Sequence, residues 1–287
     1  MNRIIGIGLI AISAASFGTL AIFGRYATAN GIDTYTLLFL RFGISAILMG
    51  ILLFLRREPF PRGRTLLQLV GMGAVGYVGQ SFCYLTAIQY ASPGLVALLL
   101  YLYPMFVAIL SSLVLHEKIT QLKGAALLIA LVGTALTINP QGGQVPGILL
   151  ALSAALIYSV YIIVGTHVMQ TVSALQSSTV IFTSAGLVYA GLMGFNGPRW
   201  PAGIFGWCII AGVVFIATVI PVVAFLAGLQ RIGPTNASML STLEPVVTVV
   251  LAAVLFNDAL KPLTLLGGCL ILAAVILLTR GELRKTR

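Results

Sequence analysis

The chain has 287 residues, of which 59% are hydrophobic and 8% are charged, and its formal net charge at pH 7 is +10. A soluble domain carries about 25% charged residues, so this composition excludes a water-facing surface and indicates a protein solvated mostly by lipid. The positive charges lie in short gaps between apolar runs and are not interleaved with stacking aromatics, which argues against a nucleic-acid partner.

Ten apolar runs close to the bilayer length of about 20 residues follow one another along the chain. They are continuously apolar rather than alternating, which predicts membrane-spanning helices and not β-strands. The first run is longer than the apolar core of a signal peptide, so we interpret it as a retained helix. The predicted helices are Ile4–Gly24, Thr34–Leu55, Leu66–Ile88, Pro93–Leu115, Leu122–Ile138, Pro146–Val168, Ser173–Phe195, Gly203–Gly228, Thr235–Phe256 and Pro262–Thr279.

The distribution of Lys and Arg predicts the orientation of these helices. If the N-terminus lies in the cytoplasm, twelve Lys and Arg residues fall on the cytoplasmic side and three, Arg25, Arg199 and Lys261, fall outside. Cytoplasmic loops are the ones enriched in Lys and Arg. The sequence therefore predicts that both termini are cytoplasmic.

The two halves of the chain resemble each other at a nearly constant offset. Each half holds five predicted helices, and an odd number requires the second copy to enter the membrane from the opposite side. We therefore expect one five-helix repeat over residues 1–139 and an inverted copy over residues 146–287, an arrangement typical of secondary transporters with a site near the bilayer midplane. Gln89, Pro93, Pro104 and Glu117 match Gln230, Pro234, Pro245 and Asp258, in each case 141 residues further on.

Short motifs add a family resemblance that covers essentially the whole chain. Leu40-Arg41-Phe42, Leu243-Glu244-Pro245-Val246 and the run Gly267-Gly268…Leu272, together with the repeat, resemble the drug/metabolite transporter superfamily and within it the EamA-type ten-helix exporters. The chain is most similar to the YddG-like aromatic amino-acid exporters. This resemblance implies a multi-pass protein of the bacterial inner membrane that exports amino acids or similar small metabolites. Tyr103 stands where the second repeat has Glu244, so the repeats differ at that position.

Two charged residues lie well inside predicted helices, where a charge costs about 2.5–3.5 kcal/mol on insertion scales. Glu244 shares a helix face with Ser241, and we interpret it either as a carboxylate that binds the amine of a substrate or carries a coupling proton, or as a packing residue bonded to a neighbouring helix. Arg41 is interpreted either as a partner for a substrate carboxylate or for Glu244, or as a side chain that snorkels to the outer headgroups.

A stripe of polar and aromatic residues at helical spacing predicts the wall of a cavity. Tyr77, Gln80, Ser81 and Tyr84 form this stripe on helix 3, and aromatic residues of two other helices are expected to complete the wall. Each of these residues has an alternative role in helix packing. The complete set of expected substrate-binding residues is Tyr77, Gln80, Ser81, Tyr84, Tyr101, Tyr158, Tyr161, Ser241 and Glu244.

The predicted function is secondary active export of amino acids, either aromatic or other neutral ones, by alternating access, with Pro104 and Pro245 as hinges. Protons are a candidate coupling partner, and both a monomer and a homodimer are compatible with the sequence. A carrier of another solute class, a drug cation or a nucleotide sugar, is the alternative. No Gly-x-x-x-x-Gly-Lys-Ser/Thr motif and no cluster of catalytic side chains is present in the sequence, so we expect no enzyme activity and no cofactor. The cysteines lack metal-ligand spacing, so no metal is expected.

Overall fold

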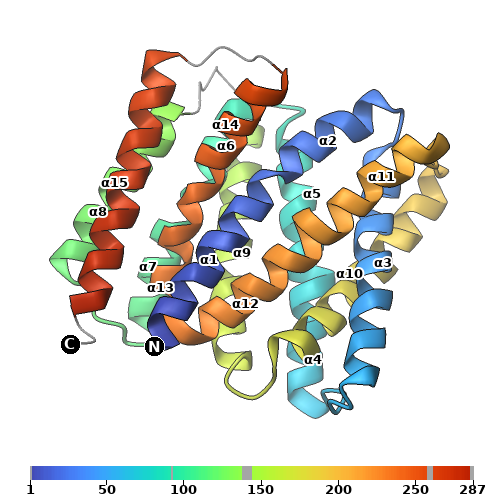
Figure 1. Ribbon diagram of the computed structural model, residues 1–287, viewed down its shortest axis with the longest axis horizontal. Coiled ribbons are helices and arrows are strands. Elements are labelled where there is room, and N and C mark those ends of the chain that lie inside the picture. The colour runs from blue at the N-terminus through green and yellow to red at the C-terminus, as the bar shows by residue number, and fades with distance from the viewer. Residues whose placement is uncertain (1, 92, 138–143, 257–260, 285–287) are drawn as a thin grey trace.

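The computed structural model describes residues 2–91, 93–137, 144–256 and 261–284, and within these ranges the chain is helical (Figure 1). The predicted end of the fifth helix, Ile138, and the predicted end of the first repeat at residue 139 lie outside them. The elements are α1 Asn2–Gly18, α2 Leu20–Ala29, α3 Thr34–Leu55, α4 Gly63–Gly71, η1 Met72–Tyr77, α5 Val78–Ala87, α6 Pro93–Leu100, α7 Tyr103–Val114, α8 Gln121–Thr137, α9 Val145–Val168, α10 Ala174–Asn196, α11 Gly203–Val214, η2 Phe215–Val219, α12 Ile220–Ile232, α13 Pro234–Leu240, η3 Ser241–Leu243, α14 Glu244–Phe256 and α15 Pro262–Arg284.

These elements combine into ten apolar spans, which confirms the predicted fold class. In the described residues nine helical segments are long and apolar enough to cross a membrane, and α8 is a shorter apolar helix that completes the set. The first span runs over Arg3–Ala29 and ends five residues beyond the predicted Gly24. The prediction stopped at the first polar residues, whereas the helix continues through Arg25 until Asn30 caps it.

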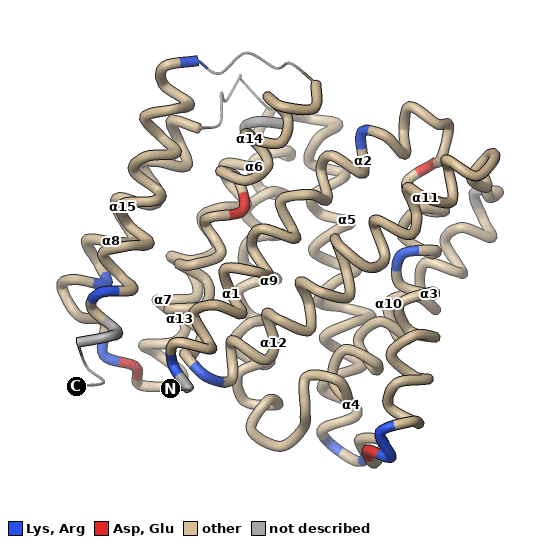
Figure 2. The backbone as a smooth tube through the Cα atoms, in the orientation of Figure 1, with Lys and Arg blue, Asp and Glu red and all other residues tan. Residues whose placement is uncertain are grey.

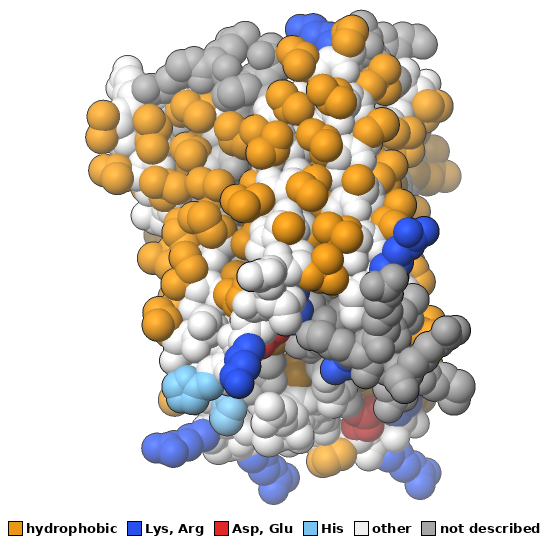
Figure 3. Space-filling view, turned by 90° about the vertical axis from the view of Figure 1, so that its left-hand side faces the viewer, with side chains coloured by type: hydrophobic (Ala, Val, Ile, Leu, Met, Phe, Trp, Pro, Cys, Tyr) orange, Lys and Arg blue, Asp and Glu red, His pale blue; other side chains and the backbone are white. Residues whose placement is uncertain are grey.

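The exterior of the bundle is apolar over most of its height, as a lipid-facing surface must be. Large hydrophobic side chains such as Phe54, Phe195 and Ile204 are more than 80% exposed. The space-filling view shows such side chains as a broad band, with Lys and Arg gathered mostly below it (Figure 3). The tube view places most Lys and Arg at the end of the bundle that carries both termini (Figure 2). This agrees with a multi-pass membrane protein, and the cytoplasmic assignment of that end stays a prediction.

Helices at equivalent positions in the two repeats pack against each other. Helix α3 lies along its counterpart α10, and α8 lies along α15 (Figure 1). The contact of α1 with α12 has its equivalent in the contact of α9 with α5. Close approach is possible because small residues meet: a Cβ on Gly267 of α15 would lie 2.5 Å from the carbonyl oxygen of Gly133 in α8.

The starts of α3 and α10 are capped in equivalent ways. Asp33 accepts hydrogen bonds from the backbone N–H groups of Thr36 (3.0 Å) and, across the repeats, of Arg199 (3.1 Å). Ser173 forms a capping box with Gln176 and donates its hydroxyl to Glu58 at 2.5 Å. Each cap therefore ties the start of one helix to the loop that follows its counterpart in the other repeat.

Candidate functional site

Two helices depart from α-geometry at equivalent places in the repeats. In the third span, which consists of α4, η1 and α5, the segment η1 has π-helical turns. In the eighth span, which consists of α11, η2 and α12, the segment η2 has them as well. Single π-helical turns are rare and occur frequently at functional sites. The repeat offset of 141 residues pairs Tyr77, the last residue of η1, with Thr218 in η2. Both of these residues contact Arg41.

Arg41 is buried between the two repeats, with 5% of its surface exposed. Its Nε donates to the Thr218 hydroxyl at 2.7 Å, and its Nη2 donates to the carbonyl oxygen of Ala217 at 3.3 Å. The Tyr77 hydroxyl interacts electrostatically with the Arg41 side chain, and the guanidinium lies 4.9 Å from the centre of the Phe42 ring. The snorkelling interpretation is therefore wrong, because polar partners in the interior replace the headgroups.

The fourth and ninth spans are both interrupted just before an equivalent proline. Residues Tyr101 and Leu102 form a turn between α6 and α7, and η3 separates α13 from α14. Pro104 and Pro245, the predicted hinges, follow these breaks directly and are both buried. Discontinuous helices of this kind build the substrate sites of many transporters.

The break in the ninth span places Glu244 at the first position of α14, inside the protein. Its carboxylate interacts electrostatically with the Tyr101 hydroxyl and with Arg41. Four further tyrosines, Tyr77, Tyr84, Tyr103 and Tyr158, also lie within its electrostatic reach. We name Arg41, Glu244 and these five tyrosines the central cluster.

Aromatic rings connect the two ends of the central cluster. The Tyr77 ring lies 5.2 Å from Phe42 and 5.7 Å from Tyr161, centroid to centroid, in edge-to-face geometry. Tyr158 lies 5.8 Å from Tyr161 in a stacked arrangement and 4.8 Å from Tyr103 in an edge-to-face one. Edge-to-face pairs of this kind add about 0.5–1.5 kcal/mol beyond their buried area. The rings therefore hold each other in place along helices α7 and α9 and segment η1.

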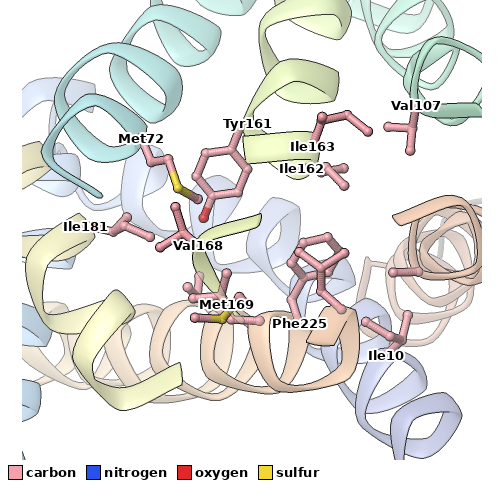
Figure 4. Close-up of a cluster of buried hydrophobic side chains, with 14 of the residues drawn as sticks. Ile10, Met72, Val107, Tyr161, Ile162, Ile163, Val168, Met169, Ile181 and Phe225 are labelled. Atoms are coloured by element: carbon pink, nitrogen blue, oxygen red, sulfur yellow. The ribbon is translucent and has the colours of Figure 1, made fainter. Parts of the chain in front are cut away.

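The remaining expected residues surround this core at different depths. Tyr161 is buried, and the close-up shows its hydroxyl among Met72 and Val168, so it supports the cluster from behind (Figure 4). Ser241 is also buried and donates to the Ala237 carbonyl at 2.9 Å. Gln80 and Ser81 are half-buried, and the Ser81 hydroxyl lies 3.4 Å from the Gln80 side-chain oxygen.

The central cluster borders a space that side chains do not fill. Glu244, Tyr77, Tyr101 and Tyr158 belong to spans of the bundle interior, and yet each is only half-buried by accessible surface. Part of each side chain is therefore left uncovered by other protein atoms.

The broken spans approach each other at one end of the bundle only. Helices α7 and α13, on the side of the termini, pack together, whereas α6 and α14 on the opposite side are not a packed pair within the described residues. The space at the central cluster is therefore sealed towards the end that carries the termini. On the opposite side the residual contacts include Arg25, whose guanidinium lies 3.9 Å from the centre of the Phe256 ring.

A four-residue polar cluster holds the sealed end together. Glu117, in the loop after α7, pairs with Lys123 at 2.7 Å and accepts hydrogen bonds from the Ser111 hydroxyl at 2.5 Å and the Thr235 hydroxyl at 2.7 Å. Burial raises the pKa of the Glu117 carboxyl, but the hydrogen bonds from Lys123, Ser111 and Thr235 outweigh this effect and leave the pKa below its usual value. We name these residues the Glu117 cluster. Thr235 begins the ninth span, so the cluster links the two repeats.

A separate hollow of about 490 Å³ opens at the same end of the bundle, between the α9–α10 loop and the end of α12. Its lining includes Gln170, Ser173 and Arg231 but no residue of the central cluster. The described residues contain no group of three or more His, Cys, Asp or Glu side chains arranged to hold a metal ion.

Ten membrane-spanning helices, inverted repeats, paired broken spans and an enclosed polar and aromatic cluster define a membrane transporter. The family model of the EamA-like transporters matches residues 4–139 and 145–280, and the chain belongs to this family. The family is one of transporters, which confirms that the chain is not an enzyme.

Individual relatives are distant. An uncharacterized transporter of Archaeoglobus fulgidus is 29% identical over 277 residues, which are 96% of each chain. The aromatic amino acid exporter YddG of Ancylobacter novellus is 25% identical over 220 residues, 74% of each chain. A solved crystal structure superimposes with a TM-score of 0.82 over 100% of this chain and 99% of that chain at 23% identity, which supports the fold alone.

Sequence analysis missed three residues that the structure brings to the site. Thr218 accepts a hydrogen bond from Arg41, Tyr103 contacts Tyr158 edge to face, and Tyr189 stacks on Phe42 at 5.7 Å. The repeat contained a signal for the first of these, because the 141-residue offset pairs Thr218 with Tyr77, which was expected at the site. Tyr189 carried no such signal, since it follows an apolar stretch in which no other polar aromatic residue occurs.

Proposed function

We propose that this protein is a secondary transporter that exports amino acids, aromatic or other neutral ones, by alternating access. The observation that carries the proposal is the relation between Arg41 and Glu244. They attract each other across the site but do not come within the 4.0 Å of a direct ion pair, although both residues are described. Opposite charges held apart in this way suit a zwitterion, whose ammonium group binds Glu244 and whose carboxylate binds Arg41.

The surroundings of the two charges favour a substrate with an apolar or aromatic side chain. Tyr77, Tyr84, Tyr101 and Tyr158 offer ring faces and edges, and their hydroxyls supply a few directed hydrogen bonds. The similarity to the aromatic amino acid exporter YddG supports the same class of substrate. Nucleotide sugars fit less well, because their phosphates need several cationic side chains and the cluster offers Arg41 alone among its described members.

An organic cation is the second candidate substrate, and one observation favours it. Glu244 surrounded by tyrosines resembles the sites that proteins use for cations, where a carboxylate and aromatic faces act together. Arg41 distinguishes the candidates, since a buried guanidinium opposes a cation and attracts a carboxylate. In both cases we propose an inner-membrane location, as the family resemblance implies, with both termini in the cytoplasm, as the positive-inside bias predicts; the structure is then outward-facing.

Flux measurements in proteoliposomes test the proposal. Purified protein is reconstituted, and efflux of a labelled panel of amino acids and organic cations is followed with and without a pH gradient. We expect efflux of one or more neutral amino acids, reduced at least tenfold by Glu244→Gln and Tyr77→Ala at equal protein levels. Tyr90→Ala is the matched control, because Tyr90 is 42% exposed and lies outside the central cluster.

Wild-type efflux rates in both site variants would contradict the site. Transport of organic cations without any amino acid would replace the amino-acid proposal with the second candidate. Acceleration of efflux by an inward proton gradient, lost in Glu244→Gln, would identify Glu244 as the group that carries a coupled proton.

A further inference from the structure

We propose that Thr218 is a positioning residue: together with the carbonyl of Ala217 it orients the Arg41 guanidinium and thereby makes the site selective for substrates that carry a carboxylate. This inference rests on the proposed function, since it names the part of the site that recognises one end of a zwitterion. It assigns a purpose to η2, the π-helical segment of helix 8.

The hydroxyl of Thr218 can meet Arg41 only as an acceptor. A threonine hydroxyl has one hydrogen to donate, and this hydrogen goes to the carbonyl oxygen of Val213 at 2.7 Å, five residues earlier in the helix. The oxygen lone pairs are then left for the Arg41 Nε, also at 2.7 Å. Because both bonds are short and Thr218 is 0% exposed, the direction of the Nε–H bond is fixed.

The carbonyl of Ala217 is available for a related reason. In an α-helix it would accept from the N–H of the residue four positions later, and that residue is Pro221, which has none. The acceptor lies inside the protein, where an unpaired carbonyl is costly, and the Arg41 Nη2 donates to it at 3.3 Å. The proline and the π-turn together therefore present two acceptors to one edge of the guanidinium.

This arrangement leaves part of the guanidinium free for a ligand. Arginine has five N–H donors. Among the described contacts, Thr218 and Ala217 engage one donor each, so three donors remain. A carboxylate takes two donors in a bidentate contact, so the remaining donors are enough for one. With its other edge held, the guanidinium does not have to lose side-chain freedom when the substrate arrives.

Thr218→Val tests the proposal, because it removes the hydroxyl and keeps the shape of the side chain. Two probes separate the effects: labelled phenylalanine, and unlabelled phenethylamine, which shares the ring and the ammonium group but has no carboxylate. We expect the KM for phenylalanine to rise about tenfold or more with little change in kcat, as expected for the loss of a hydrogen bond to a charged group. The inhibition constant of phenethylamine should stay at its wild-type value, and Thr218→Ser should restore the KM.

Pro221→Ala is an independent second variant. It returns an N–H to the position four residues after Ala217, where it competes with Arg41 for the carbonyl, and it should raise the KM for phenylalanine several-fold while phenethylamine binding is unchanged. Equal changes for the two probes, no change at all, or a failure of Thr218→Ser to restore the KM would overturn the proposal alone. A wild-type protein that binds no amino acid would overturn the proposed function together with it.

Discussion

The Glu117 cluster offers a direct test of which end of the site is sealed. Replacing Glu117 by Gln keeps one acceptor oxygen but removes the negative charge that faces Lys123, a residue with 7% of its side chain exposed. Hydrogen bonds to charged groups contribute about 1.5–3 kcal/mol each, and the Glu117 side chain is 25% exposed, which weakens them. We therefore expect the sealed state to lose about 2 kcal/mol relative to the state open at that end, which is about a 30-fold shift in the ratio of the two states.

A buried cysteine reports this shift. Ala237 lies in α13 at the sealed end and is 0% exposed, so Ala237→Cys in a background without Cys83, Cys208 and Cys269 should react slowly with a membrane-impermeant maleimide. Adding Glu117→Gln should raise the labelling rate from the side of the termini by up to about 30-fold.

The matched control is Lys118→Gln, which removes a charge from an exposed position of the same loop. If Glu117→Gln labels no faster than this control, the cluster does not hold the end closed and the reasoning fails.

The pH dependence follows from the lowered pKa of Glu117: the stabilisation is fully present above the ordinary pKa of a glutamate and is lost as the pH falls through the lower value in the folded protein. The ratio of the labelling rates with and without Glu117→Gln should consequently be independent of pH between about 5.5 and 8, because the pH dependence of the cysteine thiol itself cancels in the ratio.

Two further predictions concern the scaffold. Gly267→Ala should lower the melting temperature in detergent by several degrees, because the new Cβ would lie 2.5 Å from the Gly133 carbonyl oxygen. Gly124→Ala is the control and should leave the melting temperature unchanged, because its new Cβ would have no atom within 4 Å. Equal melting temperatures of the two variants would contradict the packing of α8 on α15. Burial raises the pKa of Asp33, but the hydrogen bonds from Thr36 and from neighbouring backbone N–H groups outweigh burial and lower the pKa. The helix cap formed by Asp33 therefore stabilises the protein fully above the ordinary pKa of an aspartate. This stabilisation is lost as the pH falls through the lower pKa of the folded protein. The melting temperature of Asp33→Asn should therefore approach that of the wild type as the pH falls through this lowered pKa, and a difference that is independent of pH would contradict the role of the carboxylate.

The sequence contained enough to predict the spans, the repeat and the cluster around Glu244. Continuous apolar runs specify membrane helices because lipid excludes unpaired backbone, and an intramembrane carboxylate is conspicuous because it is costly. The division of the chain at residues 1–139 and 146–287 stays a prediction.

What could not be predicted depends on departures from ideal helices. An α-turn and a π-turn have the same apolar composition, so nothing in the hydropathy of residues 215–219 distinguishes η2 from its neighbours. Arg41 was misjudged for this reason: its acceptors, the Thr218 hydroxyl and the Ala217 carbonyl, exist only because helix 8 is distorted there. Pro221 was a visible cause of such a distortion, but its consequence for a residue 180 positions earlier in the chain required coordinates.

The distortions themselves bear on the proposed mechanism, because they occur in pairs. The π-segments lie at equivalent places in helices 3 and 8, and the breaks lie at equivalent places in the fourth and ninth spans. Each repeat therefore contains the same kinds of helix distortion as the other. The two repeats can exchange conformations during alternating access without forming a new type of turn. The two ends differ instead in their side chains: the Glu117 cluster seals one of them, whereas Arg25 on the ring of Phe256 is a contact of the other. In the proposed alternating access, these end contacts set the free-energy difference between the two states, and the central cluster stays assembled in both.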